Sequence, residues 1–133
     1  FDLSVMMADN LSATINLVAD GGELVRTIYG CSVPVVAACT GHALAAGALI
    51  LLGSDVRIGA AGVPAKIGLN EAAIGAPLPE FALTLTRERL SKRHVARAAL
   101  GATMCPPPKR LTSDVSMRSW RRMICASRRS SMR

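Results

Sequence analysis

A buried strand that runs directly into a stretch of small residues is the feature that most constrains the fold. Residues 33–39 are rich in valine and alanine, residues 41–47 are small apart from His42 and Leu44, and residues 48–52 are continuously apolar. A short apolar run after a turn is typical of a buried parallel strand, and the apolar run after the small residues favours a buried helix. We therefore predict a strand, a tight turn and a helix within residues 33–53.

The other segments alternate between helix and strand. Apolar spacing predicts a helix, or a helix pair interrupted at Asp20-Gly-Gly, over residues 8–29. Residues 55–60 and 65–70 are predicted to be extended, and residues 80–90 and 91–100 to be helical, with Ser91 as the N-cap of the second helix. This order predicts an α/β fold in layers.

The basic character of the chain comes entirely from its last part. The net charge is +7 over 133 residues, yet residues 1–105 hold eight basic and eight acidic residues. Residues 106–133 hold eight basic residues and only one acidic residue, Asp114. We therefore divide the chain into a domain over residues 1–107 and a basic Arg/Ser-rich tail over residues 108–133, which its composition predicts to be disordered.

The composition disfavours several classes of protein. No apolar run reaches the roughly 18–20 residues of a membrane span, so we expect no membrane insertion. The four cysteines form no C-x-x-C pair, and no histidine stands at metal-ligand spacing. We therefore expect free thiols, no metal site and a cytoplasmic setting. Nucleic-acid binding by residues 109–133 is an alternative function, although Trp120 is the only aromatic residue there.

The predicted turn and helix start have the chemistry to stabilise an oxyanion. The first N–H groups of a helix lack internal acceptors and lie at the positive end of the helix dipole, so an enolate oxygen beside Ala45 and Ala46 would be stabilised. Glu71 follows an apolar extended run, where burial raises the proton affinity of a carboxylate and suits it to acid–base work. The alternatives are ordinary close packing for the small residues and a surface turn for Glu71.

In combination, these motifs resemble the enoyl-CoA hydratase/isomerase (crotonase) superfamily over about residues 1–105. Residues 1–3 are similar to the end of an A-G-x-D-[IL] segment. Residues 34–55 resemble the family's P-[VI]-[VI]-A-x-[VN]-x-G-x-A-x-G-G-G segment with its following helix and aspartate. The segment from Ile67 to Glu71 resembles most closely the Δ3,Δ2-enoyl-CoA isomerase branch, and residues 100–107 resemble the stretch before the family's C-terminal strand and helices.

The resemblance implies a partial ββα spiral core that lacks the family's N-terminal strands and C-terminal helices. It implies an acyl-CoA thioester substrate whose carbonyl is held by two backbone N–H groups, one of which falls on Ala46, whereas the other falls upstream of Phe1. Coenzyme A is part of the substrate, so no separate cofactor is expected, and the parent enzyme is expected to be a homotrimer or a dimer of trimers. The chain as given is expected to be an inactive, poorly folded fragment, and a non-catalytic remnant is an alternative reading.

The resemblance also bears on the reaction. Hydratases of the family use two glutamates, of which the first falls on Leu49 and the second on Glu71. A single carboxylate favours double-bond isomerisation from Δ3 to Δ2, with hydration as the alternative. Substrate contacts are expected from Ala45, Gly47, Leu49, Leu78 and Phe81. His42 is expected to be a packing or polar-capping residue.

Residues 108–133 are predicted to be a frameshifted tail. Back-translation with GC-rich codons and a step back of one nucleotide at Pro108 can give Glu-Glu-Ala-Asp-Val-Gly-Arg-Phe-Asp-Glu-Val-Val, which is similar to the family's continuation. Sequencing the coding DNA from upstream of Phe1 through Arg133 tests this prediction. We expect upstream DNA that encodes the A-G segment and a shifted frame that continues as acidic, family-like sequence. DNA that encodes the chain as given, with a stop after Arg133, would contradict it.

Overall fold

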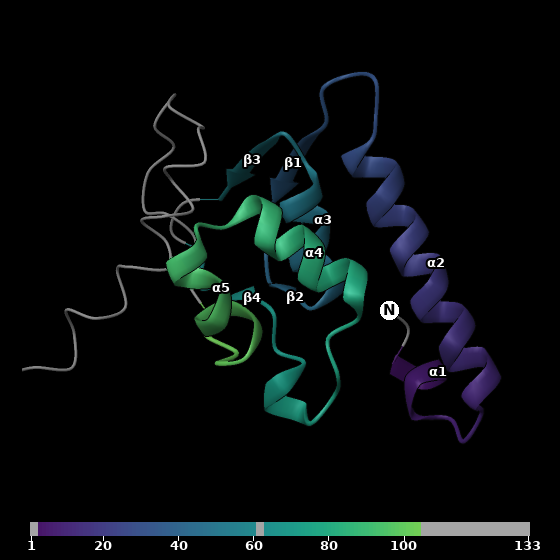
Figure 1. Ribbon diagram of the computed structural model, residues 1–133. Coiled ribbons are helices and arrows are strands. Elements are labelled where there is room, and N and C mark those ends of the chain that lie inside the picture. The colour runs from purple at the N-terminus through teal and green to yellow at the C-terminus, as the bar shows by residue number, and fades with distance from the viewer. Residues whose placement is uncertain (1–2, 61–62, 105–133) are drawn as a thin grey trace, which may run out of the picture.

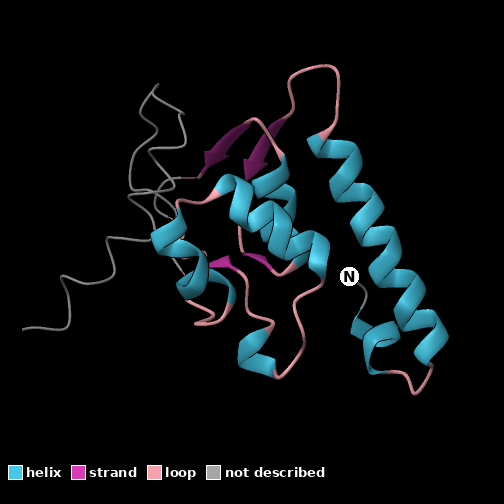
Figure 2. Cartoon of the chain, in the orientation of Figure 1, coloured by secondary structure: helices cyan, strands magenta, loops and turns pink. Residues whose placement is uncertain are grey.

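The computed structural model describes residues 3–60 and 63–104 of the chain, so the predicted tail over residues 108–133 lies outside the described residues. Helices and strands are interspersed along this part of the chain, which confirms the α/β prediction (Figures 1 and 2). The elements in chain order are α1 Leu3–Met7, α2 Leu11–Tyr29, β1 Val36–Cys39, β2 Ala43–Leu44, α3 Ala46–Gly53, β3 Val56–Gly59, β4 Ile67–Gly68, the 3₁₀ helix η1 Ala72–Ile74, α4 Glu80–Arg89 and α5 Lys92–Ala99.

Helix α2 is one continuous helix, so the alternative of a helix pair interrupted at Asp20-Gly-Gly is wrong. The Asn10 side chain accepts a hydrogen bond from the Ala13 N–H and caps the start of the helix. Glycine normally weakens a helix, but Gly22 lies directly against the ring of Phe81 on α4. A Cβ atom at position 22 would come within 3.1 Å of that ring, so this glycine permits close packing between two helices.

The strands form two separate parallel pairs, β1 with β3 and β2 with β4. The first pair aligns Val36 with Val56 and confirms two predicted strands. The second pair aligns Ala43 with Ile67 and Leu44 with Gly68. Strand β2 lies inside the segment predicted to be a tight turn, and α3 begins at residue 46 rather than 48. The small residues therefore contain a short strand as well as the turn.

Helix α3 is the centre of the described structure, because α2 and α4 both pack against it (Figure 1). Leu49 and Leu52 are each only 2% exposed. The core around them consists of Val25, Ala43, Ala48, Leu51, Ile67, Leu69, Ala82, Leu85, Leu90 and Ala98. An apolar helix that is buried on most of its surface matches the continuous apolar run in the sequence.

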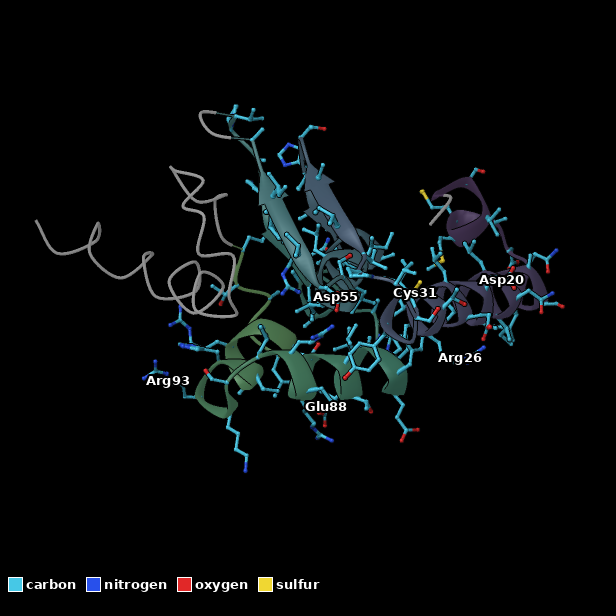
Figure 3. The ribbon with its side chains drawn as sticks, turned by 90° about the horizontal axis from the view of Figure 1, so that it is seen from above. Asp20, Arg26, Cys31, Asp55, Glu88 and Arg93 are labelled. Atoms are coloured by element: carbon cyan, nitrogen blue, oxygen red, sulfur yellow. The ribbon has the colours of Figure 1, made fainter. Side chains whose placement is uncertain are left out.

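Polar groups hold the end of α3 to its neighbours. The Arg57 guanidinium donates to the carbonyl oxygens of Leu51, at 2.9 Å, and Ser54, at 2.8 Å. A positive charge at this end of a helix is favourable. Asp55 lies between the β1–β3 pair and α4 (Figure 3), and its carboxylate accepts the Val35 N–H at 2.9 Å. These bonds fix the strand that follows α3 beside β1.

Some large apolar side chains are not covered by any described part of the chain. Val36 on the β1–β3 pair is 57% exposed, and Leu11 near the start of α2 is 75% exposed. On β1, Val36 and Ala38 are both exposed and no residue of the strand is fully buried, whereas α2 buries Val25 further along the helix. The described residues therefore form a core and leave two apolar surfaces exposed, one at β1 and one at the start of α2.

We expect Leu52→Ala to lower the free energy of unfolding by about 2–5 kcal/mol, because it removes a fully buried side chain and leaves a cavity. Urea unfolding measures the loss. Leu100→Ala is the matched control, because Leu100 is 76% exposed and its truncation should change the stability by no more than about 0.5 kcal/mol. Equal losses in the two variants would show that α3 is not the core helix.

Candidate active site

The pairing of β2 with β4 brings the two predicted catalytic groups to one edge of a parallel sheet. Ala46 follows β2 by two residues, and Glu71 follows β4 by three residues. In a parallel sheet the carboxyl ends of neighbouring strands lie at the same edge, where ligands of α/β proteins commonly bind. The hydrogen bond from the Ala45 N–H to the Gly68 carbonyl, at 3.1 Å, extends the strand pairing up to the N-cap residue of α3.

The start of α3 presents a free backbone donor. Ala46 is the first residue of the helix, and no described residue accepts a hydrogen bond from its N–H. The preceding residue, Ala45, has φ 49° and ψ −117°, and no side chain caps the helix. An N–H group at the positive end of a helix dipole, without a protein acceptor, is suited to hold a developing oxyanion.

A cavity of about 250 Å³ between α2 and α3 reaches Ala46. Its walls are mostly apolar, and the residues that line it are Leu17, Asp20, Gly21, Leu24, Val25, Ala46 and Ile50. The sequence analysis missed the contribution of α2 to this cavity. The available signal was the spacing of Leu17, Gly21 and Leu24, which places these three residues on one face of a helix.

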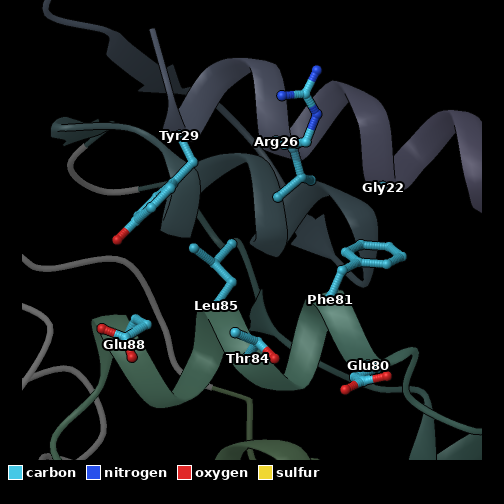
Figure 4. A pocket seen from close by; sticks show the side chains of 9 residues that line it. Gly22, Arg26, Tyr29, Glu80, Phe81, Thr84, Leu85 and Glu88 are labelled. Atoms are coloured by element: carbon cyan, nitrogen blue, oxygen red, sulfur yellow. The ribbon is translucent and has the colours of Figure 1, made fainter.

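A second cavity, of about 460 Å³, lies between α2 and α4 (Figure 4). The side chains of Tyr29, Phe81 and Leu85 point into it, and Glu80 and Glu88 also line it. Neither Ala46 nor Glu71 lines this second cavity. Phe81 is therefore brought beside α2, but not into the cavity that reaches the backbone donor.

Glu71 is half-buried at the turn between β4 and η1. Its Oε2 atom is shielded from solvent and has no hydrogen-bond partner among the described residues. Burial raises the pKa of the Glu71 carboxyl above its ordinary value, and backbone hydrogen bonds at residues 70 and 71 oppose the rise. A carboxyl group with a raised pKa and an unused oxygen can accept and return a proton near neutral pH.

The other predicted site residues are distributed around this edge. Gly47 lies in the first turn of α3, whereas Leu49 is buried in the core and lines neither cavity. Leu78 is partly buried against the core. The His42 Nδ1 atom accepts the Lys66 N–H at 2.9 Å, which confirms a polar-capping role for this residue.

The described residues contain neither a metal centre nor a membrane-spanning helix. In residues 3–60 and 63–104, no three His, Cys, Asp or Glu side chains are grouped so that they could hold a metal ion. None of the described helices is long and apolar enough to cross a membrane. Cys31 and Cys39 are free thiols, whereas the other two cysteines lie outside the described residues.

We expect Glu71→Gln to increase the free energy of unfolding at pH 7. Because folding raises the pKa of Glu71, the ionised carboxylate destabilises the folded state at neutral pH. This penalty, and with it the advantage of the glutamine variant, should disappear as the pH falls through the raised pKa to below about 4.5, the ordinary value. Urea unfolding at pH 7 and pH 4 measures both values.

Glu23→Gln is a control for which we expect the opposite change in stability at neutral pH. A hydrogen bond from Arg26 lowers the pKa of the exposed Glu23 carboxyl, so this substitution should slightly reduce stability at neutral pH. The reduction should fade as the pH falls through the lowered pKa. A Glu71 variant that follows the trend of the Glu23 variant would show that Glu71 is not desolvated.

Comparison with known proteins identifies the family of this chain. The family model described as enoyl-CoA hydratase/isomerase matches residues 1–109. A solved structure of an enoyl-CoA hydratase/isomerase family protein from Pseudomonas syringae is 37% identical, with a TM-score of 0.76, and the match covers 96% of this chain and 55% of that one. The enoyl-CoA hydratase EchA3 from Mycobacterium ulcerans is 30% identical, with a TM-score of 0.76, and covers 93% of this chain and 58% of its own.

A third similar structure, described as an enoyl-CoA isomerase from Mycobacterium tuberculosis, is 29% identical with a TM-score of 0.74, and covers 92% of this chain and 57% of its own. A search of curated proteins gave no match. The chain thus spans a little over half the length of these solved relatives, and its described part has the corresponding portion of their fold. With a family model that matches 109 of its 133 residues, the chain belongs to the enoyl-CoA hydratase/isomerase family.

Proposed function

We propose that this chain carries the catalytic edge of an enzyme that moves a double bond in an enoyl-CoA thioester from Δ3 to Δ2. Glu71 is the proton shuttle, and the Ala46 N–H is one of the two donors to the thioester oxygen. The observation that carries the proposal is the combination of a half-buried carboxylate and an unpaired backbone donor at the carboxyl edge of one strand pair.

Glu71 is the one carboxylate that the proposal assigns to the reaction, and Asp20 is the acidic residue of the cavity between α2 and α3. Leu49 occupies the position that resembles the first glutamate of the family's hydratases, and this side chain is 2% exposed within the core. An apolar side chain there cannot activate a water molecule. One carboxylate is sufficient for an isomerisation, because the proton that is removed is also returned.

The proposed reaction conserves protons and electrons. The Glu71 carboxylate takes a proton from C2 of the 3-enoyl thioester, and the electron pair of the C–H bond moves into a dienolate whose negative charge lies largely on the thioester oxygen. The Ala46 N–H stabilises that charge, with a contribution of about 3–4 kcal/mol for one donor. The protonated Glu71 then delivers its proton to C4, which produces the 2-enoyl thioester and restores the carboxylate.

The acyl chain has a binding surface next to this centre. The cavity between α2 and α3 reaches Ala46 and is lined mainly by aliphatic side chains. We propose that it receives the part of the acyl chain beyond the reacting carbons. Coenzyme A is the carrier part of the substrate, and the residues assigned here use no separate cofactor.

Hydration of a 2-enoyl-CoA is the second candidate. The relatives include proteins described as enoyl-CoA hydratases as well as one described as an isomerase. Hydration at this site would require water activated by Glu71 alone. The two reactions differ in product, because hydration gives a 3-hydroxyacyl-CoA and isomerisation keeps the double bond.

The test is the conversion of a 3-enoyl-CoA by the full-length protein in deuterated water, followed by mass spectrometry of the product. We expect a 2-enoyl-CoA that carries little deuterium at C4, because Glu71 returns the proton that it removes, and a loss of roughly 10²–10⁴-fold in the rate of Glu71→Gln, since general acid–base catalysis contributes that much. Glu23→Gln, an exposed substitution on α2, should retain the rate. Full activity of the Glu71 variant would refute the assigned role. No conversion of the 3-enoyl-CoA, together with formation of a 3-hydroxyacyl-CoA from a 2-enoyl-CoA, would favour hydration.

A further inference from the structure

We propose that Ala45 positions the Ala46 N–H, and that it does so in a strained backbone conformation which glycine would adopt without strain. This inference rests on the proposed function, because it concerns the same oxyanion donor. Ala45 has φ 49° and ψ −117°. Residues with a Cβ atom rarely adopt such values, which are typical of glycine at the first central position of a type II′ turn.

Two hydrogen bonds hold Ala45 in this conformation. Its N–H donates to the Gly68 carbonyl on β4 at 3.1 Å, and its carbonyl accepts the Leu49 N–H of α3 at 3.1 Å. The peptide groups on both sides of Ala45 are therefore fixed, one by the strand and the other by the helix. Strain of this kind persists only where the surroundings determine the conformation.

The direction of the Ala46 N–H follows from these bonds. In a planar trans peptide, the N–H points opposite to the preceding carbonyl. Because the Ala45 carbonyl points along α3 toward the Leu49 N–H, the Ala46 N–H points away from the helix, where no described residue accepts it. Ala46 itself lines the cavity between α2 and α3.

The hydrogen bond from Ala45 also reaches the segment that carries the proposed base. Gly68, which accepts the Ala45 N–H, precedes Glu71 by only three residues. One hydrogen bond therefore ties the donor peptide to the segment that carries the proton shuttle. Loss of the Ala45 conformation would change the donor direction and weaken its connection to Glu71, while the aliphatic core around Leu52 would be retained.

Substitutions at Ala45 and Ala102 separate positioning from stability. Ala102 is the other non-glycine residue with a positive φ in the described part of the chain, at 42°, and it is not part of the proposed site. Ala45→Gly removes the strain and keeps the geometry, whereas Ala45→Val introduces a β-branched side chain that φ 49° does not accommodate. Ala102→Val imposes a similar penalty at a residue that makes no hydrogen bond to Ala45 or Ala46.

The experiment has one readout without ligand and one with a probe, both on the full-length protein. Amide hydrogen exchange reports whether the N–H at position 45 is hydrogen bonded. Infrared spectroscopy of hexanoyl-CoA labelled with ¹³C at the thioester carbonyl reports polarisation of that carbonyl. Thermal unfolding is recorded for every variant.

For Ala45→Gly we expect a higher unfolding midpoint, a protected N–H at position 45 and the wild-type shift of the carbonyl band to lower frequency. For Ala45→Val we expect at least tenfold faster exchange at position 45 and loss of the band shift. Ala102→Val should lower the midpoint while it leaves both site readouts unchanged.

The outcomes distinguish this inference from the proposed function. A lower midpoint for Ala45→Gly, or an unchanged band shift in Ala45→Val, would overturn the inference. If the wild-type protein polarises no thioester carbonyl, the proposed function fails, and the role of Ala45 in thioester activation fails with it. The exchange pattern would still decide whether Ala45 holds the peptide.

Discussion

The parallel pairing of β2 with β4 is the contact on which the candidate active site depends. Each strand has only two residues, yet the pairing aligns Leu44 with Gly68 and continues into the hydrogen bond from the Ala45 N–H. It brings together two segments separated by more than twenty residues of sequence, the start of α3 and the turn at Glu71. The core around α3 supports this contact from one side through Ala43 and Ile67, which are both buried. The four residues of β2 and β4 therefore contribute to the core and also bring the proposed catalytic groups together.

The sequence predicted the large elements well, because their apolar patterns are local. The apolar runs in residues 33–39 and 48–52 correspond to β1 and α3, and the two C-terminal helices begin within a residue of their predicted starts. Strand β2 was not predicted, since two residues carry no periodicity. One of the two alternatives for residues 8–29, an interruption at Asp20-Gly-Gly, was wrong. Gly22 does not end the helix but permits close contact with Phe81, a residue almost sixty positions away. Local propensity does not report such tertiary contacts.

For the site as well, the sequence predicted the local features but not those that depend on tertiary packing. The raised pKa of Glu71 and the unpaired N–H at the start of α3 agree with what local sequence implied about burial and helix ends. The cavity beside Ala46 was not predicted, because its walls come from two helices whose packing depends on the tertiary fold. Leu49 illustrates the reverse case, in which a position assigned to substrate contact is a core side chain. Its place in the core still matters for the proposed reaction, because an apolar side chain there cannot serve as a second catalytic acid.

The position of Val25 has a consequence for how this part of the family fold can diverge. Val25 is 5% exposed and lines both the cavity between α2 and α3 and the cavity between α2 and α4. A single aliphatic side chain therefore forms part of the partition between two apolar spaces. The volume on one side of α2 is not independent of the volume on the other. A substitution at this one position would therefore change the volumes of both cavities, while the pairing of β2 with β4 would stay in place.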